Sequence, residues 1–297
     1  MSDIVTGRDA VRPHQPVRHR PPKRIRLAQQ AASILVAALF LFPLVWTVLV
    51  TFKSKAESAQ PPLPPWPVNG WSLENYHSLD QFGAGLMHYA ENSLVIAFGT
   101  AALTVVVSTL AGYGFSRFRF PMKGAFFILI LATMMVPFQS ILTPLFLILT
   151  RLHLNNSLVG LILIYVTLQL PFSVFMMRNA FDAVPREIAE AARIDGARGL
   201  KLLVFVLGPL VMPGVASVGL IAFLNAWNEF LGALVFLSDQ DKYTLPILVN
   251  AVRQGHFGAI DWGAVQAGVA VMMLPCLALF LILQRYYIRG LTAGAVK

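Results

Sequence analysis

Six long runs without a charged residue constrain this chain more than any other feature of its sequence. They lie at about residues 27–50, 92–115, 124–150, 155–177, 202–225 and 263–284. A helix needs about 20 apolar residues to cross a hydrocarbon core of about 30 Å, and each run is long enough. Because 57% of the chain is hydrophobic and only 12% is charged, an ordinary soluble enzyme is disfavoured. The sequence therefore predicts an all-α polytopic membrane protein with six transmembrane helices.

Prolines occur in every run except the second, as at Pro137 and Pro144 in the third run. Membrane helices tolerate proline where neighbouring helices satisfy the carbonyl groups that it frees. The prolines therefore predict kinked helices within a packed bundle.

The basic residues predict the orientation of these helices. Of the 23 Lys and Arg residues, 18 lie in the leader, the second and fourth connections and the tail, and 5 lie in the other connections. The positive-inside rule places the richer face in the cytoplasm. We therefore expect a multi-pass protein of the cell membrane with both termini cytoplasmic. The net charge of +9 then marks orientation, and no nucleic-acid partner is expected.

The sequence contains no recognisable catalytic or metal-binding motif. It has no P-loop, no HExxH pair, no GxSxG turn and only one cysteine, Cys276, so we expect no cofactor, metal or catalytic residue. A membrane-embedded enzyme remains an alternative, but it lacks a catalytic pair at membrane depth. A secondary carrier is a further alternative, and it is disfavoured because the six runs contain no Asp, Glu, Lys, Arg or His.

A few polar residues lie within the runs or at their ends and are candidates for a substrate pathway. Uncharged amides suit a neutral polyhydroxylated solute because they both donate and accept hydrogen bonds. The alternative is ordinary hydrogen bonding between helices. The candidates are Gln139, Gln169, Asn225, Asn228 and Glu229.

The loop at 182–201 carries the signals of a short helix. Pro185 suits a first helical turn, Glu187 complements the macrodipole there, and Gly196 permits a left-handed cap. The segment therefore predicts a helix of about ten residues followed by an abrupt turn.

One face of this predicted helix is small and shallow. Ile188, Ala191 and Ala192 share that face at helical spacing. We expect this face to fit a groove on another protein.

The same loop resembles the EAA loop of ABC importer permeases. The matching residues are Glu190-Ala191-Ala192, Gly196 and Val206-Leu207-Gly208-Pro209. Other stretches resemble the sugar-importer branch of this family, in particular the second permease of maltose-type systems. These stretches are Asn92-Ser93-Leu94, Arg117-Phe118-Arg119-Phe120-Pro121, Pro171-Phe172, Trp227-Asn228-Glu229-Phe230 and residues 289–297. Val206 and Gly208 depart mildly from the family pattern. The resemblance covers about residues 28–297, which leaves the basic leader, 1–26, as a segment that we expect to be disordered.

The resemblance implies a permease subunit that is itself non-catalytic. A second permease would complete the pathway, two ATPase subunits would drive it, an extracytoplasmic binding protein would deliver the sugar, and lipid would surround it. A permease for a non-sugar solute remains the alternative. The ATPase-coupling residues that it implies are Glu190, Ala191, Ala192, Asp195 and Gly196.

Overall fold

The computed structural model describes residues 23–60, 63–254 and 260–295, and all regular secondary structure among them is helical. Of the predicted leader, 1–26, residues 1–22 lie outside the described residues. The chain divides into two units, Met1–Val45 and Trp46–Lys297. Helix α1 (Lys23–Val50) begins in the first unit and ends in the second.

Five helical segments in the described residues are long and apolar enough to cross a membrane. They are Gln29–Val50 within α1, α4 (Leu86–Arg117), α7 (Leu158–Asp182), Leu202–Asn228, and Trp262–Gln284 within α12 (Trp262–Ala295). Several of these helices are longer than the apolar runs predicted from the sequence. The runs were bounded by charged residues, whereas a helix can continue through such residues outside the membrane. The architecture is that of a polytopic membrane protein.

The third apolar run does not form one continuous helix, which corrects the simple kink expected there. It is divided into α5 (Lys123–Ala132), the 3₁₀ turn η1 (Thr133–Met135) and α6 (Phe138–Arg151), and the two halves meet at 103°. Val136 and Pro137 both have extended backbone conformations. The cause is the proline ring, which disfavours the helical conformation for the residue before it. Taken together, the two halves provide a sixth candidate span.

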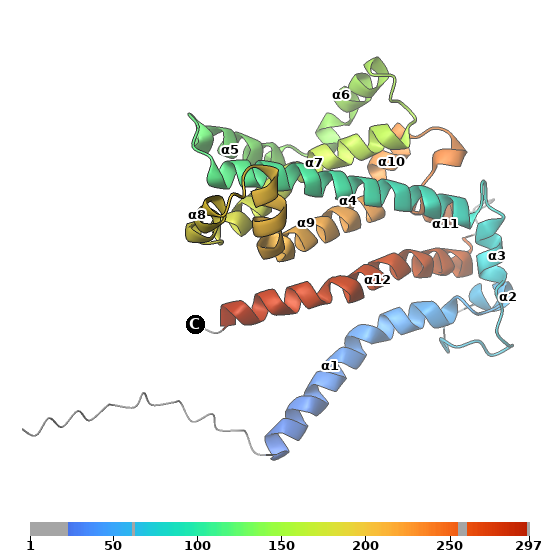
Figure 1. The fold of residues 1–297 in the computed structure, drawn as a ribbon. Helices are drawn as coiled ribbons and strands as arrows, with labels where there is room; N and C mark the ends of the chain where they lie inside the picture. Colours follow the sequence, from blue (N-terminus) through green and yellow to red (C-terminus); the bar gives the residue numbers. More distant parts are fainter. Residues whose placement is uncertain (1–22, 61–62, 255–259, 296–297) are drawn as a thin grey trace, which may run out of the picture. The chain divides into compact units, whose positions relative to one another are not determined.

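Helix α4 forms the centre of the second unit and packs along α7 and α9 (Gly208–Asn228), as Figure 1 shows. Its contact face carries small residues at intervals of about four. These are Ala97, Thr100, Thr104, Ser108 and Gly112, all of them buried. Small side chains let the backbones of membrane helices approach closely, so this face permits tight packing.

Short helices occupy the two ends of this bundle. At one end lie α2 (Lys55–Ser58), α3 (Glu74–Asp80) and α11 (Leu245–Gln254), and at the other lies α8 (Arg186–Ile194) (Figure 1). The remaining short elements are the π-helical segment η2 (Leu202–Leu207), α10 (Leu231–Phe236) and η3 (Gln240–Lys242). The bundle thus separates α8 from the cap formed by α2, α3 and α11.

Candidate functional site

Helix α8 lies within the predicted loop 182–201. It begins after Pro185 and ends before Gly196, the two residues that the sequence indicated as its boundaries. Pro185 is its N-cap, one residue before the first turn in which the sequence placed it. At the other end Gly196 has φ of +88°. The amides of Gly196 and Ala197 donate to the carbonyls of Arg193 and Ala192, at 3.1 and 2.8 Å. This pattern is a Schellman motif, which stops the helix and turns the chain back towards the bundle.

The buried face of α8 differs from the face that the sequence predicted to be free. Ala189 and Ala192 are buried against the protein's own core, so the expectation that Ala192 belongs to the free face is wrong. Helix α8 turns this side inward because a core of large apolar side chains accepts only a small residue at such close range. The cluster around them includes Tyr113, Met177, Phe181, Val184, Leu202, Leu203 and Leu207.

The opposite face of α8 is exposed and mixes acidic with apolar side chains. Ile188, Glu190, Ala191 and Asp195 are exposed, and Ile194 has 87% of its surface accessible. Within the described residues Glu190 forms no ion pair. A carboxylate beside exposed isoleucines on a short helix is a surface suited to a protein partner with a cation.

Hydrogen bonds from the end of α4 hold the approach to α8. The Arg117 guanidinium donates to the carbonyls of Phe181 and Val184 at 2.8 and 2.7 Å. The Ser116 hydroxyl donates to the Asp182 carboxylate at 2.6 Å. The Phe181 carbonyl also accepts from the Val184 amide at 3.2 Å, so Arg117 adds a second donor there and fixes the point from which α8 departs. Sequence reasoning noted Arg117 only within the resembling stretch, and nothing in the local pattern revealed these partners.

The segment that follows α8 has an unusual helical form. Residues Leu202–Leu207 adopt a π-helical conformation and lead directly into α9 at Gly208. Leu202, Leu203 and Leu207 are buried in the same cluster that holds α8. Helix α8 is therefore packed against η2, which continues into α9, and against residues at the end of α7.

A small polar pocket lies between α4, α7 and α9, and it brings together three of the five predicted pathway residues. Gln169, Asn225 and Glu229 line this cavity of about 70 Å³ together with Thr100 and Tyr165. The Asn225 amide donates to the Gln169 side-chain oxygen at 2.9 Å. The buried Thr100 hydroxyl has no hydrogen-bond partner within the described residues. The pocket thus presents uncharged donors and acceptors together with one carboxyl group, that of Glu229.

Glu229 is held firmly at the end of this pocket. It accepts a hydrogen bond from the Tyr165 hydroxyl, and its two oxygens accept from the Gly232 amide, each at 2.9 Å. The side chain therefore links α7 to the start of α10. Sequence reasoning missed Tyr165 and Thr100. Both lie inside apolar runs, where a tyrosine buried with a polar partner could have been suspected.

The other two predicted pathway residues lie outside this pocket. Gln139 is exposed in the first turn of α6. The Asn228 amide donates to the Leu224 carbonyl of its own helix at 2.8 Å. Among the described residues there is also no group of three His, Cys, Asp or Glu side chains that could hold a metal ion.

Asn92 and Ser93, near the end of α4 that is remote from α8, have a structural role. The Asn92 amide donates to the carbonyls of Asp241 and Tyr243 at 2.8 and 3.0 Å, and the Ser93 hydroxyl accepts from the Leu245 amide at 2.8 Å. These bonds hold the connection between α10 and α11 against α4. The pair therefore stabilises the end of the bundle remote from α8.

The fold and these sites are those of an integral-membrane transport subunit. A profile of the family described as "Binding-protein-dependent transport system inner membrane component" matches residues 104–293, which include the loop 182–201. The chain belongs to this family of ABC transporter permeases. The resemblance predicted from the loop motif is thereby confirmed.

Individual relatives match over most of their length. The sulfoquinovosyl glycerol transport system permease protein of Agrobacterium fabrum is 37% identical over 268 residues, which cover 90% of this chain and 92% of the relative. The trehalose/maltose transport system permease protein of Thermococcus litoralis is 35% identical, covering 93% and 97%. A crystal structure of a bacterial ABC transporter involved in the import of alginate, an acidic polysaccharide, has a TM-score of 0.74 at 21% identity. It covers 90% of this chain and 99% of that one, and it establishes a shared fold.

Proposed function

We propose that this chain is the second permease subunit of an ATP-driven importer for a neutral carbohydrate. Relatives that match nearly the whole chain are named for the transport of trehalose, maltose and arabinooligosaccharides, which supports a carbohydrate substrate. The polar pocket adds a chemical reason, because Gln169 and Asn225 are uncharged and can both donate and accept hydrogen bonds. Within a cavity of about 70 Å³ they would contact one part of a passing sugar.

The single observation that carries the mechanism is the way α8 packs, with one face on the core and the other exposed. Its inner face is packed on the core through Ala189 and Ala192, while Glu190 and Ile194 are exposed. A short helix that is rigidly joined to α7 and α9 passes a displacement to both of them. We infer that an ATPase subunit binds the exposed face and that its closure moves these helices, with Glu190 paired to a cation and Asp195 and Gly196 shaping the turn.

We also propose a six-span arrangement with both termini in the cytoplasm, in which the bent pair α5–α6 serves as the third span. The distribution of Lys and Arg supports this orientation, because 18 of the 23 lie on the side of α8 or in the termini. The partners would be a second permease, two ATPase subunits, an extracytoplasmic binding protein and the surrounding lipid.

The orientation predicts which face of the membrane exposes particular residues. In a Cys276→Ser background, His77→Cys on α3 should react with a membrane-impermeant thiol reagent added outside intact cells. Arg198→Cys beside α8 should react only after the cells are opened. Both side chains are exposed, so burial would not explain a failure to react. Labelling of Arg198→Cys from outside would refute the orientation.

Transport by the assembled complex tests the function itself. The chain, its partner permease and the ATPase should import a radiolabelled neutral oligosaccharide into vesicles only when ATP and the binding protein are both present. Collapse of the proton gradient should leave uptake unchanged, since the proposal requires no ion coupling. Uptake that follows the proton gradient, or a complex that imports only non-sugar solutes, would contradict the proposal.

A further inference from the structure

The connection between α4 and α5 is a short loop at the membrane surface. This α4–α5 loop comprises residues 118–122, between the end of α4 at Arg117 and the start of α5 at Lys123. The apolar runs on either side end at residue 115 and resume at residue 124. Five residues have a contour length of about 18 Å, so the loop turns within about 9 Å of the helix ends. It therefore lies in or beside the headgroup layer, which is about 5–7 Å thick on each side of the hydrocarbon core.

Contacts within the protein hold this loop in one conformation. The Lys123 ammonium donates to the Phe118 carbonyl at 3.1 Å, which ties the start of α5 to the loop. The Phe118 ring lies edge-on to Tyr113, with 5.4 Å between the ring centroids. The Phe120 ring lies 5.7 Å from the ring of Phe115 in the same way. The side chains that the loop exposes are therefore presented from a fixed backbone.

Several of the exposed side chains of this loop are large and apolar. Phe118 and Met122 keep 54% and 70% of their surfaces accessible, and Phe120 is exposed as well. The exposure continues along the chain into α5, where Phe126 and Leu129 are exposed. Apolar side chains at the boundary between headgroups and acyl chains bury their surface among the lipids. The loop thus has the apolar part of a lipid-binding surface.

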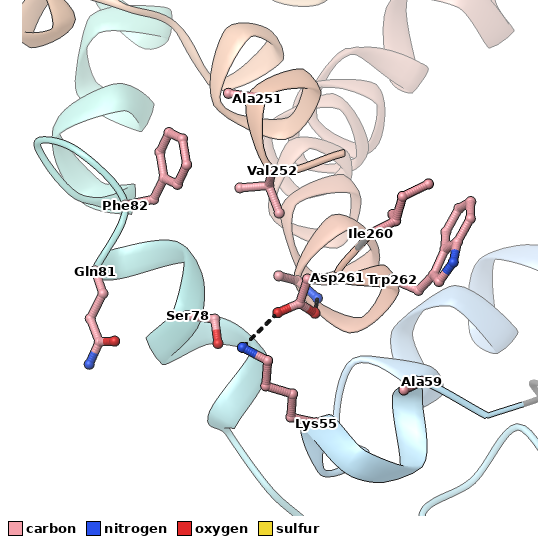
Figure 2. A pocket seen from close by; sticks show the side chains of 11 residues that line it. Lys55, Ala59, Ser78, Gln81, Phe82, Ala251, Val252, Ile260, Asp261 and Trp262 are labelled. Atoms are coloured by element: carbon pink, nitrogen blue, oxygen red, sulfur yellow. Dashed lines mark hydrogen bonds and ion pairs between the residues drawn. The ribbon is translucent and has the colours of Figure 1, made fainter. Parts of the chain in front are cut away.

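The charged residues of the loop and of the helices beside it are all basic. Between Glu91 and Asp182 the sequence contains no acidic residue. Arg119 is exposed, and its guanidinium forms no hydrogen bond or ion pair with any described residue. Lys55, an exposed cation at the other end of the bundle, differs because the Asp261 carboxylate lies 3.2 Å from its ammonium (Figure 2). An anion for Arg119 would therefore come from outside the chain.

We propose that the α4–α5 loop binds a membrane phospholipid, with Arg119 at the headgroup phosphate and Phe118 and Met122 among the upper acyl carbons. A guanidinium suits this partner because its planar set of donors binds phosphate bidentately. Phospholipid is the anion present where the loop lies, and its acyl chains cover the apolar side chains beside Arg119. The proposed ATPase surface on α8 differs, since Glu190 there requires a cation. The proposal requires only that the chain spans a membrane, so it is independent of the transported solute.

Photocross-linking of lipid to the complete complex tests this site. The complex would be reconstituted in vesicles of equal parts phosphatidylglycerol and phosphatidylcholine, with a photoreactive acyl chain on one lipid at a time. Mass spectrometry should find lipid on residues 118–126, with phosphatidylglycerol favoured about fivefold, the effect of one basic residue at an anionic surface. Arg119→Gln should abolish this preference, and Arg119→Lys should keep most of it. Met122→Ser should lower the cross-linking of both lipids and leave their ratio unchanged.

A cation at the opposite end of the bundle provides the matched control. Arg253 is exposed on α11, and Arg253→Gln should leave the lipid ratio on residues 118–126 unchanged. Equal labelling by the two lipids in the wild-type complex, or a preference that survives Arg119→Gln, would overturn the headgroup site. Lipid on these residues in the isolated chain but not in the complex would show that another subunit covers the loop, and the proposal would then be wrong.

Discussion

Replacement of Glu190 by alanine should abolish carbohydrate uptake while leaving the chain inserted at its normal level. Glu190 is exposed on α8 and forms no ion pair within the described residues, so its removal costs the isolated fold little. At the proposed ATPase interface the loss would leave a partner cation unpaired. Truncation of one member of a buried charge pair costs about 2–5 kcal/mol. Uptake, membrane level and co-purification of the ATPase should be measured on the same preparation.

A matched carboxylate controls for the loss of charge itself. Glu91 is also exposed and lies near the start of α4, at the opposite end of the bundle. Glu91→Ala should retain both uptake and the ATPase. If Glu190→Ala transports at the wild-type rate with the ATPase bound, α8 is an ordinary connector and the coupling proposal is wrong.

Replacement of Gly112 by alanine should destabilise the bundle strongly, although it adds only one methyl group. A Cβ at Gly112 would lie 2.6 Å from the Met177 Cβ and 2.8 Å from the Arg178 backbone nitrogen. Real Cβ atoms do not approach so closely, so α4 and α7 would have to separate. Overpacking of this kind costs about 1–3 kcal/mol. Thermal unfolding of the purified complex should show the loss.

The same helix offers the control for this substitution. A Cβ at Gly114 would find its nearest neighbour, a Phe118 ring carbon, at 4.0 Å, an ordinary contact distance. Gly114→Ala should therefore be neutral or stabilising by up to about 1 kcal/mol, because alanine favours helix over glycine. Equal unfolding temperatures for the two alanine variants would contradict the tight contact of α4 with α7.

Much of the protein's class could be predicted from its sequence. Apolar runs of membrane length predicted the long helices, because a chain cannot leave backbone polar groups unpaired in lipid and must form helix there. The turn at Gly196 was predictable because glycine adopts positive φ without strain. The loop residues Glu190-Ala191-Ala192 identified the family, since their spacing to Gly196 is specific to that loop. Each of these features depends on local sequence.

The tertiary structure alone decided which side chains meet. An apolar run has no polar side to mark its orientation, so periodicity did not reveal that Tyr165 would reach Glu229. On α8, which is not an apolar run, the inward side was set by the core that Ala189 and Ala192 pack against. The bend at Pro137 is larger than a kink because two successive extended residues interrupt the helix. The ion pair of Lys55 and Asp261 joins segments that are far apart in the sequence. Such sites depend on how helices pack against one another, and that packing is set by contacts between distant segments rather than by local propensity.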